Sequence, residues 1–124
     1  MDSKGYRSLL VWERGMELVE EVYRLTDRMP TDERFGLVSQ MQRSAISIPS
    51  NIAEGYSRSH GGDYLKHLSY ARGSLAELET QLIAAVRVKR IEREHAVPCW
   101  ELCQEVGKML TGLIKKVAEG RHSS

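Results

Sequence analysis

Three residues near the start of the last predicted helix are of types that ligate metal ions. His95, Cys99 and Cys103 follow one another at intervals of four, so a helix would place them on one face. A zinc site would need a further ligand from elsewhere, and the sequence offers no obvious donor. Di-iron sites in helical bundles use Glu-x-x-His motifs that point into the middle of the bundle, whereas Glu92 to His95 falls at a helix start. We therefore expect no metal and no cofactor, and we interpret both cysteines as small core residues.

The serines and histidines do not follow a pattern of nucleophilic catalysis. The catalytic serine of an α/β-hydrolase lies on a turn between a strand and a helix, and this chain shows no strand alternation. The glycine pair Gly61 and Gly62 lacks the rest of a phosphate-binding loop. His60 and His67 lie seven residues apart, and we interpret them as solvated side chains. The sequence therefore predicts a protein that is not an enzyme and that takes no small-molecule substrate.

Basic side chains gather at both ends of the predicted helices and could contact a polyanion. The chain has 18 basic and 17 acidic residues, so binding would depend on local clusters rather than on net charge. Phosphate contacts of this kind are sensitive to salt. The alternative is that these cations complement helix ends, with Glu92 and Glu94 cancelling part of the charge. No aromatic residue lies among them in the sequence, so base stacking is not indicated. Arg58 lies at one end of the predicted bundle, together with Lys115, Lys116 and Arg121. The residues that we predict to contact RNA or DNA are Arg87, Lys89, Arg90 and Arg93 at the opposite end, and Arg58.

A polar stripe follows the second predicted helix beside its apolar face. Its members are Gln40, Ser44, Ser47, Asn51, Glu54 and Arg58, at alternate spacings of four and three. The stripe is either a ligand or RNA site or a surface that packs against another helix or subunit. We favour packing, with Asn51 and Glu54 buried to fix register, because bundles use polar seam residues in this way. The residues that we predict to act in assembly are Ser47, Pro49, Ser50, Asn51, Glu54 and Gly55.

Four amphipathic helices must position these residues, and we expect them over residues 8–28, 33–56, 61–87 and 93–119. Apolar residues recur every three or four positions, as in buried helices. In the first helix they are Leu9, Trp12, Met16, Val19, Tyr23 and Thr26. In the third they are Tyr64, Leu68, Ala71, Leu75, Leu78, Leu82 and Ala85. Short connections predict an all-α, antiparallel up-down-up-down bundle, as one domain over residues 1–124.

Two local features refine this bundle. Pro49 lies inside the second helix, where we expect a kink rather than a break because the apolar stripe keeps its phase across it. Residues 57–62 should form a loop, with Ser59 as a cap for the next helix. The turns at 29–32 and 87–93 should then share one end of the bundle. No apolar run reaches the ~20 residues that span a bilayer, and no secretory signal opens the chain, so we expect a cytoplasmic protein without membrane contact.

The segment from Ser47 to Gly55, Ser-Ile-Pro-Ser-Asn-Ile-Ala-Glu-Gly, resembles the signature of a family of four-helix-bundle proteins encoded in intervening sequences of bacterial 23S ribosomal RNA genes. Residues 10–12, 35–40 and 73–82 fit the same family, and the resemblance covers about 6–117. It implies a ring-shaped homopentamer. Relatives include the accessory protein of diversity-generating retroelements, which partners a reverse transcriptase and nucleic acid. The chain departs from the family at 87–93, where Val-Lys-Arg replaces a frequent Gly-aromatic turn, so the resemblance leaves that turn open.

Together these patterns predict a non-enzymatic, oligomeric bundle that binds or scaffolds RNA or another nucleic acid, or a partner that processes RNA. The alternative is a protein-interaction or self-assembly scaffold without nucleic acid. Assembly would bring copies of the basic cluster at 87–93 together and strengthen a weak patch.

Overall fold

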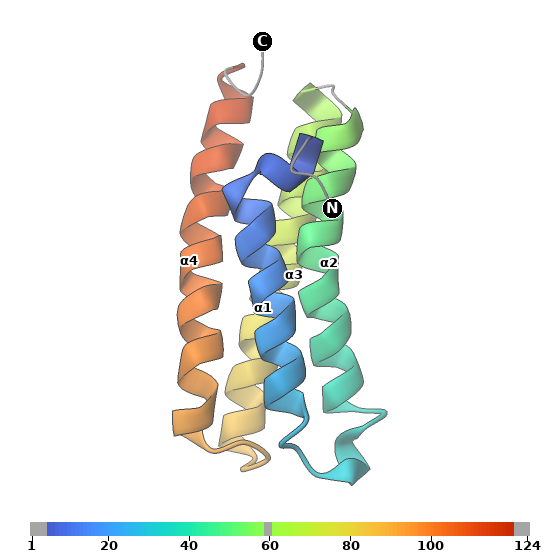
Figure 1. The fold of residues 1–124 in the computed structure, drawn as a ribbon, viewed down its shortest axis with the longest axis vertical. Helices are drawn as coiled ribbons and strands as arrows, with labels where there is room; N and C mark the ends of the chain where they lie inside the picture. The colour runs from blue at the N-terminus through green and yellow to red at the C-terminus, as the bar shows by residue number, and fades with distance from the viewer. Residues whose placement is uncertain (1–4, 59–60, 121–124) are drawn as a thin grey trace.

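The computed structural model describes residues 5–58 and 61–120, which form four long helices (Figure 1). The elements are a 3₁₀ turn η1 (Gly5–Ser8), α1 (Leu10–Thr26), a second 3₁₀ turn η2 (Thr31–Glu33), α2 (Leu37–Arg58), α3 (Gly61–Arg87) and α4 (Arg93–Ala118). Consecutive helices run in opposite directions, and the connections 27–36 and 88–92 lie at one end of the bundle. The predicted all-α four-helix bundle is confirmed.

The helices form a square in which each packs against two neighbours. Within the described residues, the backbone of α1 lies close to α2 and α4, the backbone of α3 lies close to the same two helices, and the backbones of the diagonal pairs are farther apart. The closest association is between α2 and α3. The square therefore has four outer sides, each formed by two adjacent helices, and the α1–α2 side lies opposite the α3–α4 side.

Helix boundaries differ from the predicted ones mainly around the first and second connections. The first helix is shorter than predicted and ends at Thr26, and α2 begins at Leu37 after the separate turn η2. The predicted loop over 57–62 is too long, because Ser57 and Arg58 continue α2. The predicted helix over 61–87 is confirmed, since α3 runs from Gly61 to Arg87. The predicted cap Ser59 lies outside the described residues.

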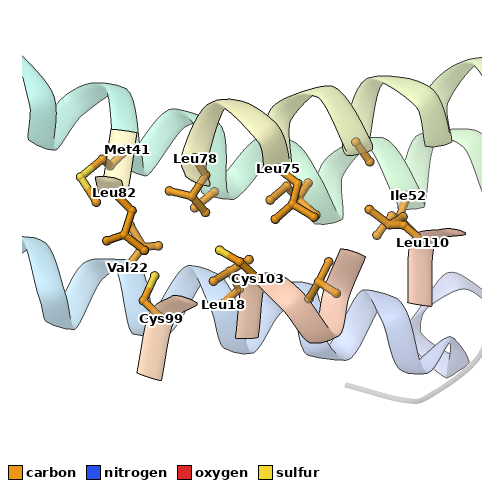
Figure 2. Close-up of a cluster of buried hydrophobic side chains, with 14 of the residues drawn as sticks. Leu18, Val22, Met41, Ile52, Leu75, Leu78, Leu82, Cys99, Cys103 and Leu110 are labelled. Carbon is orange, nitrogen blue, oxygen red and sulfur yellow. The ribbon is translucent and has the colours of Figure 1, made fainter. Parts of the chain in front are cut away.

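The core runs along the centre of the bundle and is built from aliphatic residues and both cysteines. All seven apolar residues predicted for the third helix are buried. Cys99 and Cys103 are fully buried, and Figure 2 shows them among Leu18, Val22 and Leu82. Apolar burial of this kind contributes roughly 25 cal/mol per Å² to folding. The two thiols therefore act as small core residues, as the sequence predicts.

The core-facing stripe of α1 lies one position away from the predicted one. Its buried aliphatic residues are Val11, Leu18, Val22 and Leu25, whereas Tyr23 of the predicted stripe is 40% exposed. Apolar residues cover a wide arc of this helix, so the spacing alone allowed either orientation. The buried line also contains Gly15, where an added Cβ would lie 3.5 Å from the Cβ of Pro49 on α2.

Pro49 is buried at this contact, and α2 continues through it as one helix. The expectation of one helix rather than two is confirmed. A kink is expected here because the pyrrolidine ring crowds the preceding turn on the side of Ala45. The kink itself stays a prediction.

The sequence left the geometry of the turn at 87–93 open, and the structure shows it in the connection between α3 and α4. Lys89 has a φ of 63°, in the left-handed region that favours glycine. The Arg90 amide donates to the Ala85 carbonyl at 2.9 Å and the Lys89 amide donates to the Val86 carbonyl at 3.1 Å. This pair of bonds is the Schellman pattern, with lysine at the position that glycine usually fills.

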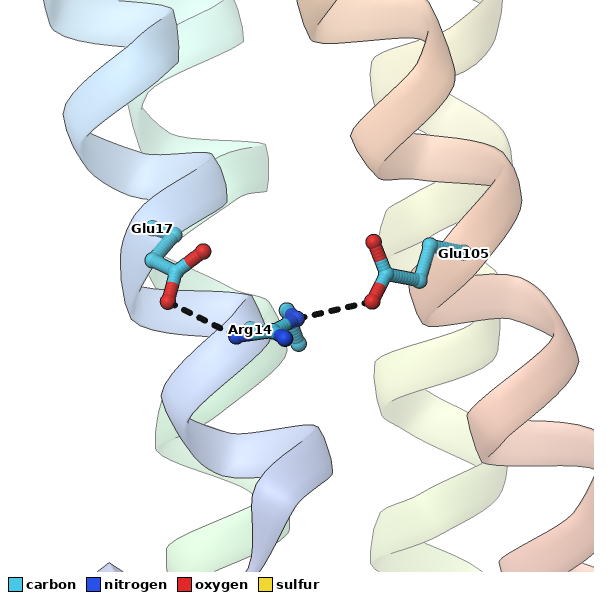
Figure 3. Close-up of polar contacts among 3 residues, drawn as sticks. All are labelled: Arg14, Glu17 and Glu105. Atoms are coloured by element: carbon cyan, nitrogen blue, oxygen red, sulfur yellow. Dashed lines mark hydrogen bonds and ion pairs between the residues drawn. The ribbon is translucent and has the colours of Figure 1, made fainter.

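Ion pairs link neighbouring elements at the surface. Arg90 Nε donates to Glu33 Oε2 at 2.6 Å and joins the two connections, which confirms that they share one end. Arg14 lies between α1 and α4, where its Nε donates to Glu105 at 2.7 Å and its Nη1 to Glu17 at 2.9 Å (Figure 3). The hydrogen bond to Glu105 and the charge of Glu17 raise the pKa of Arg14. Exposed pairs of this kind mainly set orientation and contribute little to stability.

Candidate nucleic-acid interface

Two of the predicted nucleic-acid contacts line one groove between α3 and α4. Arg87 is the last residue of α3 and Arg93 the first of α4, and both side chains line this groove. Lys89 is exposed on the connection between them. Within residues 5–58 and 61–120, none of these three cations forms an ion pair. All three are therefore available to an anionic partner.

The other two predicted contacts are occupied or distant. Arg90 is paired with Glu33. Arg58 lies near the opposite end of the bundle and pairs with Glu54 at 2.9 Å, one helical turn earlier. The structure therefore does not bring Arg58 together with the cluster at 87–93. Lys115 and Lys116 are exposed in the last turn of α4, and Arg121 lies outside the described residues.

The groove between α3 and α4, which we call the Trp100 groove, has a volume of about 370 Å³. Its lining residues are Leu82, Ile83, Val86, Arg87, Arg93, Ala96, Val97 and Trp100. Trp100 is 37% exposed, and Ile83 and Val97 are also exposed. Both charged residues of the lining are cationic. The groove thus combines an aromatic ring, an apolar floor and positive charge.

The sequence contained a signal for Trp100 that the first interpretation missed. Trp100 follows Arg93 by seven residues, and this spacing returns to the same face of a helix. The prediction that no aromatic residue lies among these charges is therefore wrong in the folded protein, where Trp100 shares a groove with Arg87 and Arg93.

A second hollow continues along the same α3–α4 side, with a volume of about 460 Å³. Its charged lining residues are Arg72, Glu79 and Lys108. Gln104 Nε2 donates to Glu79 Oε2 at 3.0 Å across the two helices. In the part of the chain that the structure describes, Arg72 and Lys108 form no ion pair. The two hollows together are lined by four cations and one carboxylate.

Beyond the open end of the Trp100 groove the charge is mixed. A shallow depression there is lined by Lys89 and Arg93 and also by Glu92 and Glu94. The two carboxylates reduce the positive potential at the tip of the bundle, as the sequence predicts. The positive character is therefore stronger along the α3–α4 side than at the tip.

The predicted polar stripe of α2 packs against α3 at Ser47, as the favoured packing interpretation expects. The Ser74 hydroxyl donates to Ser47 Oγ at 2.8 Å. Asn51 Nδ2 donates to the carbonyl and to the hydroxyl oxygen of Ser47, both at 2.9 Å. Gly55 is buried, and an added Cβ would lie 2.8 Å from the Cβ of His67. The signature segment therefore allows close packing within one chain.

Three expectations about individual polar residues need correction or limits. Glu54, expected to be buried, is exposed and pairs with Arg58. The signature residue Ser50 is exposed as well. His67, expected to be solvated, is half-buried, and its Nδ1–H donates to the Asp63 carbonyl at 2.9 Å. His60 lies outside the described residues. The role of the signature residues in assembly stays a prediction.

Cys99 and Cys103 are not placed for metal chemistry. The pKa of the Cys103 thiol is raised because it shares a hydrogen bond with Cys99 and because it is buried. Metal binding needs the thiolate. Across the residues that the structure covers, no three side chains of His, Cys, Asp or Glu are grouped to hold a metal ion.

Within residues 5–58 and 61–120, no helix combines the length and hydropathy that crossing a membrane requires.

Comparisons with known proteins agree with this fold. The model of a family described as 23S rRNA-intervening sequence protein matches residues 7–112. A crystal structure of a protein of unknown function from the S23 ribosomal protein family of Bacteroides thetaiotaomicron aligns with a TM-score of 0.76 at 24% sequence identity. The alignment covers 86% of this chain and 99% of that one. A search of curated proteins found no match.

Proposed function

The chain belongs to the family of 23S rRNA-intervening sequence proteins, and we propose that it is a non-enzymatic, cytoplasmic, oligomeric protein that binds RNA along its α3–α4 side. This side would hold the RNA backbone, or would present RNA to a partner that processes it. The proposal includes assembly of several copies, a pentamer by the resemblance, which would place one groove per subunit around a common axis and multiply a weak contact.

The observation that carries this proposal is the charge of the α3–α4 side. Four cations line its two hollows, namely Arg72, Arg87, Arg93 and Lys108, against the single carboxylate of Glu79. The whole chain has a net charge of only +1, so the lining of these two hollows is more basic than the chain as a whole. A local excess of unpaired cations attracts a polyanion through release of its counterions.

The second candidate is a protein-interaction scaffold without nucleic acid. It is favoured by exposed apolar residues outside the α3–α4 side. Tyr23 and Ile46 line a hollow between α1 and α2 and are 40% and 44% exposed. Phe35 is 90% exposed beside Arg34. Exposed apolar groups that gather on one surface mark interaction sites.

The test is RNA binding by matched double variants at several salt concentrations. Arg87→Ser with Arg93→Ser removes two cations from the groove. Arg28→Ser with Arg43→Ser removes two exposed cations that line neither α3–α4 hollow and changes the net charge equally.

Loss of two phosphate contacts should lower the salt slope by about 1.4 and the affinity by about 25-fold at about 0.1 M salt. Equal affinity for the two double variants would refute the assignment to the α3–α4 side. A partner retained from cell extract after nuclease treatment would favour the scaffold.

A further inference from the structure

We infer that the Trp100 groove selects single-stranded over double-stranded nucleic acid by stacking a base on Trp100. This inference rests on the proposed function and names the form of nucleic acid that the same side would take. It depends on the aromatic ring and the apolar floor, whereas the proposed function depends on the cations alone.

Trp100 differs from the other tryptophan in how it is used by the fold. Trp12 packs edge-on against Tyr6, with ring centroids 5.3 Å apart, and lies against the core. Trp100 is 37% exposed at the wall of the groove, and among the described residues it packs against no other aromatic ring. A large apolar ring left exposed in this way is available for a flat, apolar partner such as a nucleobase.

The rest of the groove lining fits an unpaired base better than a duplex. The floor is apolar and includes Leu82, Val86 and Ala96. A duplex keeps its bases stacked on each other and presents phosphates, sugars and base edges. Those polar groups would lose water against an apolar floor without gaining hydrogen bonds. A single strand can turn one base into the groove and leave its phosphates outside.

The cations lie where the flanking phosphates of such a strand would need them. Arg87 lines the groove from α3 and Arg93 lines it from α4. Farther along the same side, Arg72 and Lys108 line the second hollow. Arg93 and Lys108 are fifteen residues apart on α4, which corresponds to about 22 Å of helix rise. A single strand could therefore follow the α3–α4 side from the Trp100 groove to the second hollow.

An acidic amphipathic helix of a partner protein is the competing occupant. Grooves between two helices accept such helices through apolar anchors. The unpaired cations Arg87 and Arg93 fit either anionic occupant. The exposed ring of Trp100, and the further cations Arg72 and Lys108 along the same side, favour an extended single strand. The competing occupant is therefore an outcome of the test.

The experiment compares one mixed-sequence RNA strand, alone and annealed to its complement, by titration against the full chain. A Trp12→Phe background leaves Trp100 as the only tryptophan, so fluorescence reports on the groove. We expect the single strand to quench this fluorescence and to bind more tightly than the duplex. Because Trp100 variants lose this signal, their affinities are measured by the anisotropy of a fluorescent label on the same RNA strand. Trp100→Leu, which keeps apolar bulk without the ring, should lower single-strand affinity between about 5-fold and 150-fold, whereas Trp100→Phe should keep part of it.

The outcomes separate the two proposals. If Trp100→Leu binds like the parent, or if the duplex binds equally well, the inference fails, and the proposed function stands provided that Arg87→Ser with Arg93→Ser still weakens binding. If no nucleic acid binds the parent, both fail. Quenching by an acidic amphipathic peptide but not by RNA would assign the groove to a protein partner and overturn the inference.

Discussion

Replacement of Gly55 by alanine should destabilise the bundle, whereas the same replacement at Gly73 should stabilise it. Both glycines lie inside long helices, so alanine gains up to about 1 kcal/mol of helix propensity at either position. At Gly73 an added Cβ meets no heavy atom within 4 Å. The helix propensity should then appear undiminished in the free energy of unfolding.

At Gly55 the added Cβ meets atoms that cannot move aside cheaply. It would lie 2.8 Å from His67 Cβ, 3.1 Å from Tyr64 Cδ1 and 3.3 Å from the Tyr64 carbonyl oxygen. The carbonyl belongs to the α3 backbone, and the position of His67 Cβ is fixed by that backbone. Overpacking of this kind costs about 1–3 kcal/mol, so α2 and α3 must separate slightly to accept it. The net loss at Gly55 should therefore reach about 2 kcal/mol.

The assay is urea denaturation of the two variants and the parent, followed by far-UV circular dichroism. The variants should differ by about 1–3 kcal/mol, or by roughly 4–12 °C in melting temperature. Gly112→Ala is a second control in α4, because its added Cβ also meets nothing within 4 Å. A Gly55→Ala variant as stable as these controls would refute the explanation of the signature glycine as a close-packing residue.

Three further results are expected from the connection, the core and the α2–α3 contact. Lys89→Gly should stabilise the chain by up to about 1 kcal/mol, because glycine adopts the left-handed backbone without strain. Thermal unfolding would measure the change in stability, and a variant less stable than the parent would contradict the prediction. Cys99 and Cys103 should resist iodoacetamide in the folded protein and react once the protein is unfolded by denaturant. Mass spectrometry would detect the labelled cysteines, and rapid labelling of the native chain would contradict their burial. Burial raises the pKa of Tyr64 to about 12, above the unfolded value of about 10. The folded state therefore keeps this proton longer, and stability should fall by up to about 2–3 kcal/mol as the pH rises from about 10 to 12, a loss that Tyr64→Phe should reduce.

The sequence predicts a helix well where its apolar spacing allows only one face to enter the core. In α3 the apolar residues form a narrow stripe at spacings of four and three, so only one face can enter the core. In α1 the apolar residues cover a wider arc, and the spacing could not choose between a stripe through Tyr23 and one through Val22. The contact of Gly15 with Pro49 belongs to the α1–α2 interface, and no pattern within α1 contains it.

The candidate site was predictable only in part for a similar reason. The cluster at 87–93 is local, so Arg87 and Arg93 could be selected from the sequence. The pairing of Arg90 with Glu33 joins residues 57 positions apart, and it removes one predicted contact. Trp100 belongs to the site because α3 and α4 lie side by side, which places its ring in the same groove as Arg87.

The signature segment and the basic side of the bundle are separate features, and this separation limits what family membership implies. Ser47 is hydrogen-bonded to Ser74 on α3, Pro49 lies against Gly15 on α1, and Gly55 lies against Tyr64. These three residues of the motif therefore pack α2 within one chain, whereas Ser50 and Glu54 are exposed. The cations of the α3–α4 side lie outside this motif, at exposed positions that core packing does not constrain. A chain could therefore keep the signature and the fold while losing the groove charges. For this reason the RNA proposal has to be tested at Arg87 and Arg93 and the stacking inference at Trp100, because substitution of a buried signature residue such as Pro49 or Gly55 would first affect folding.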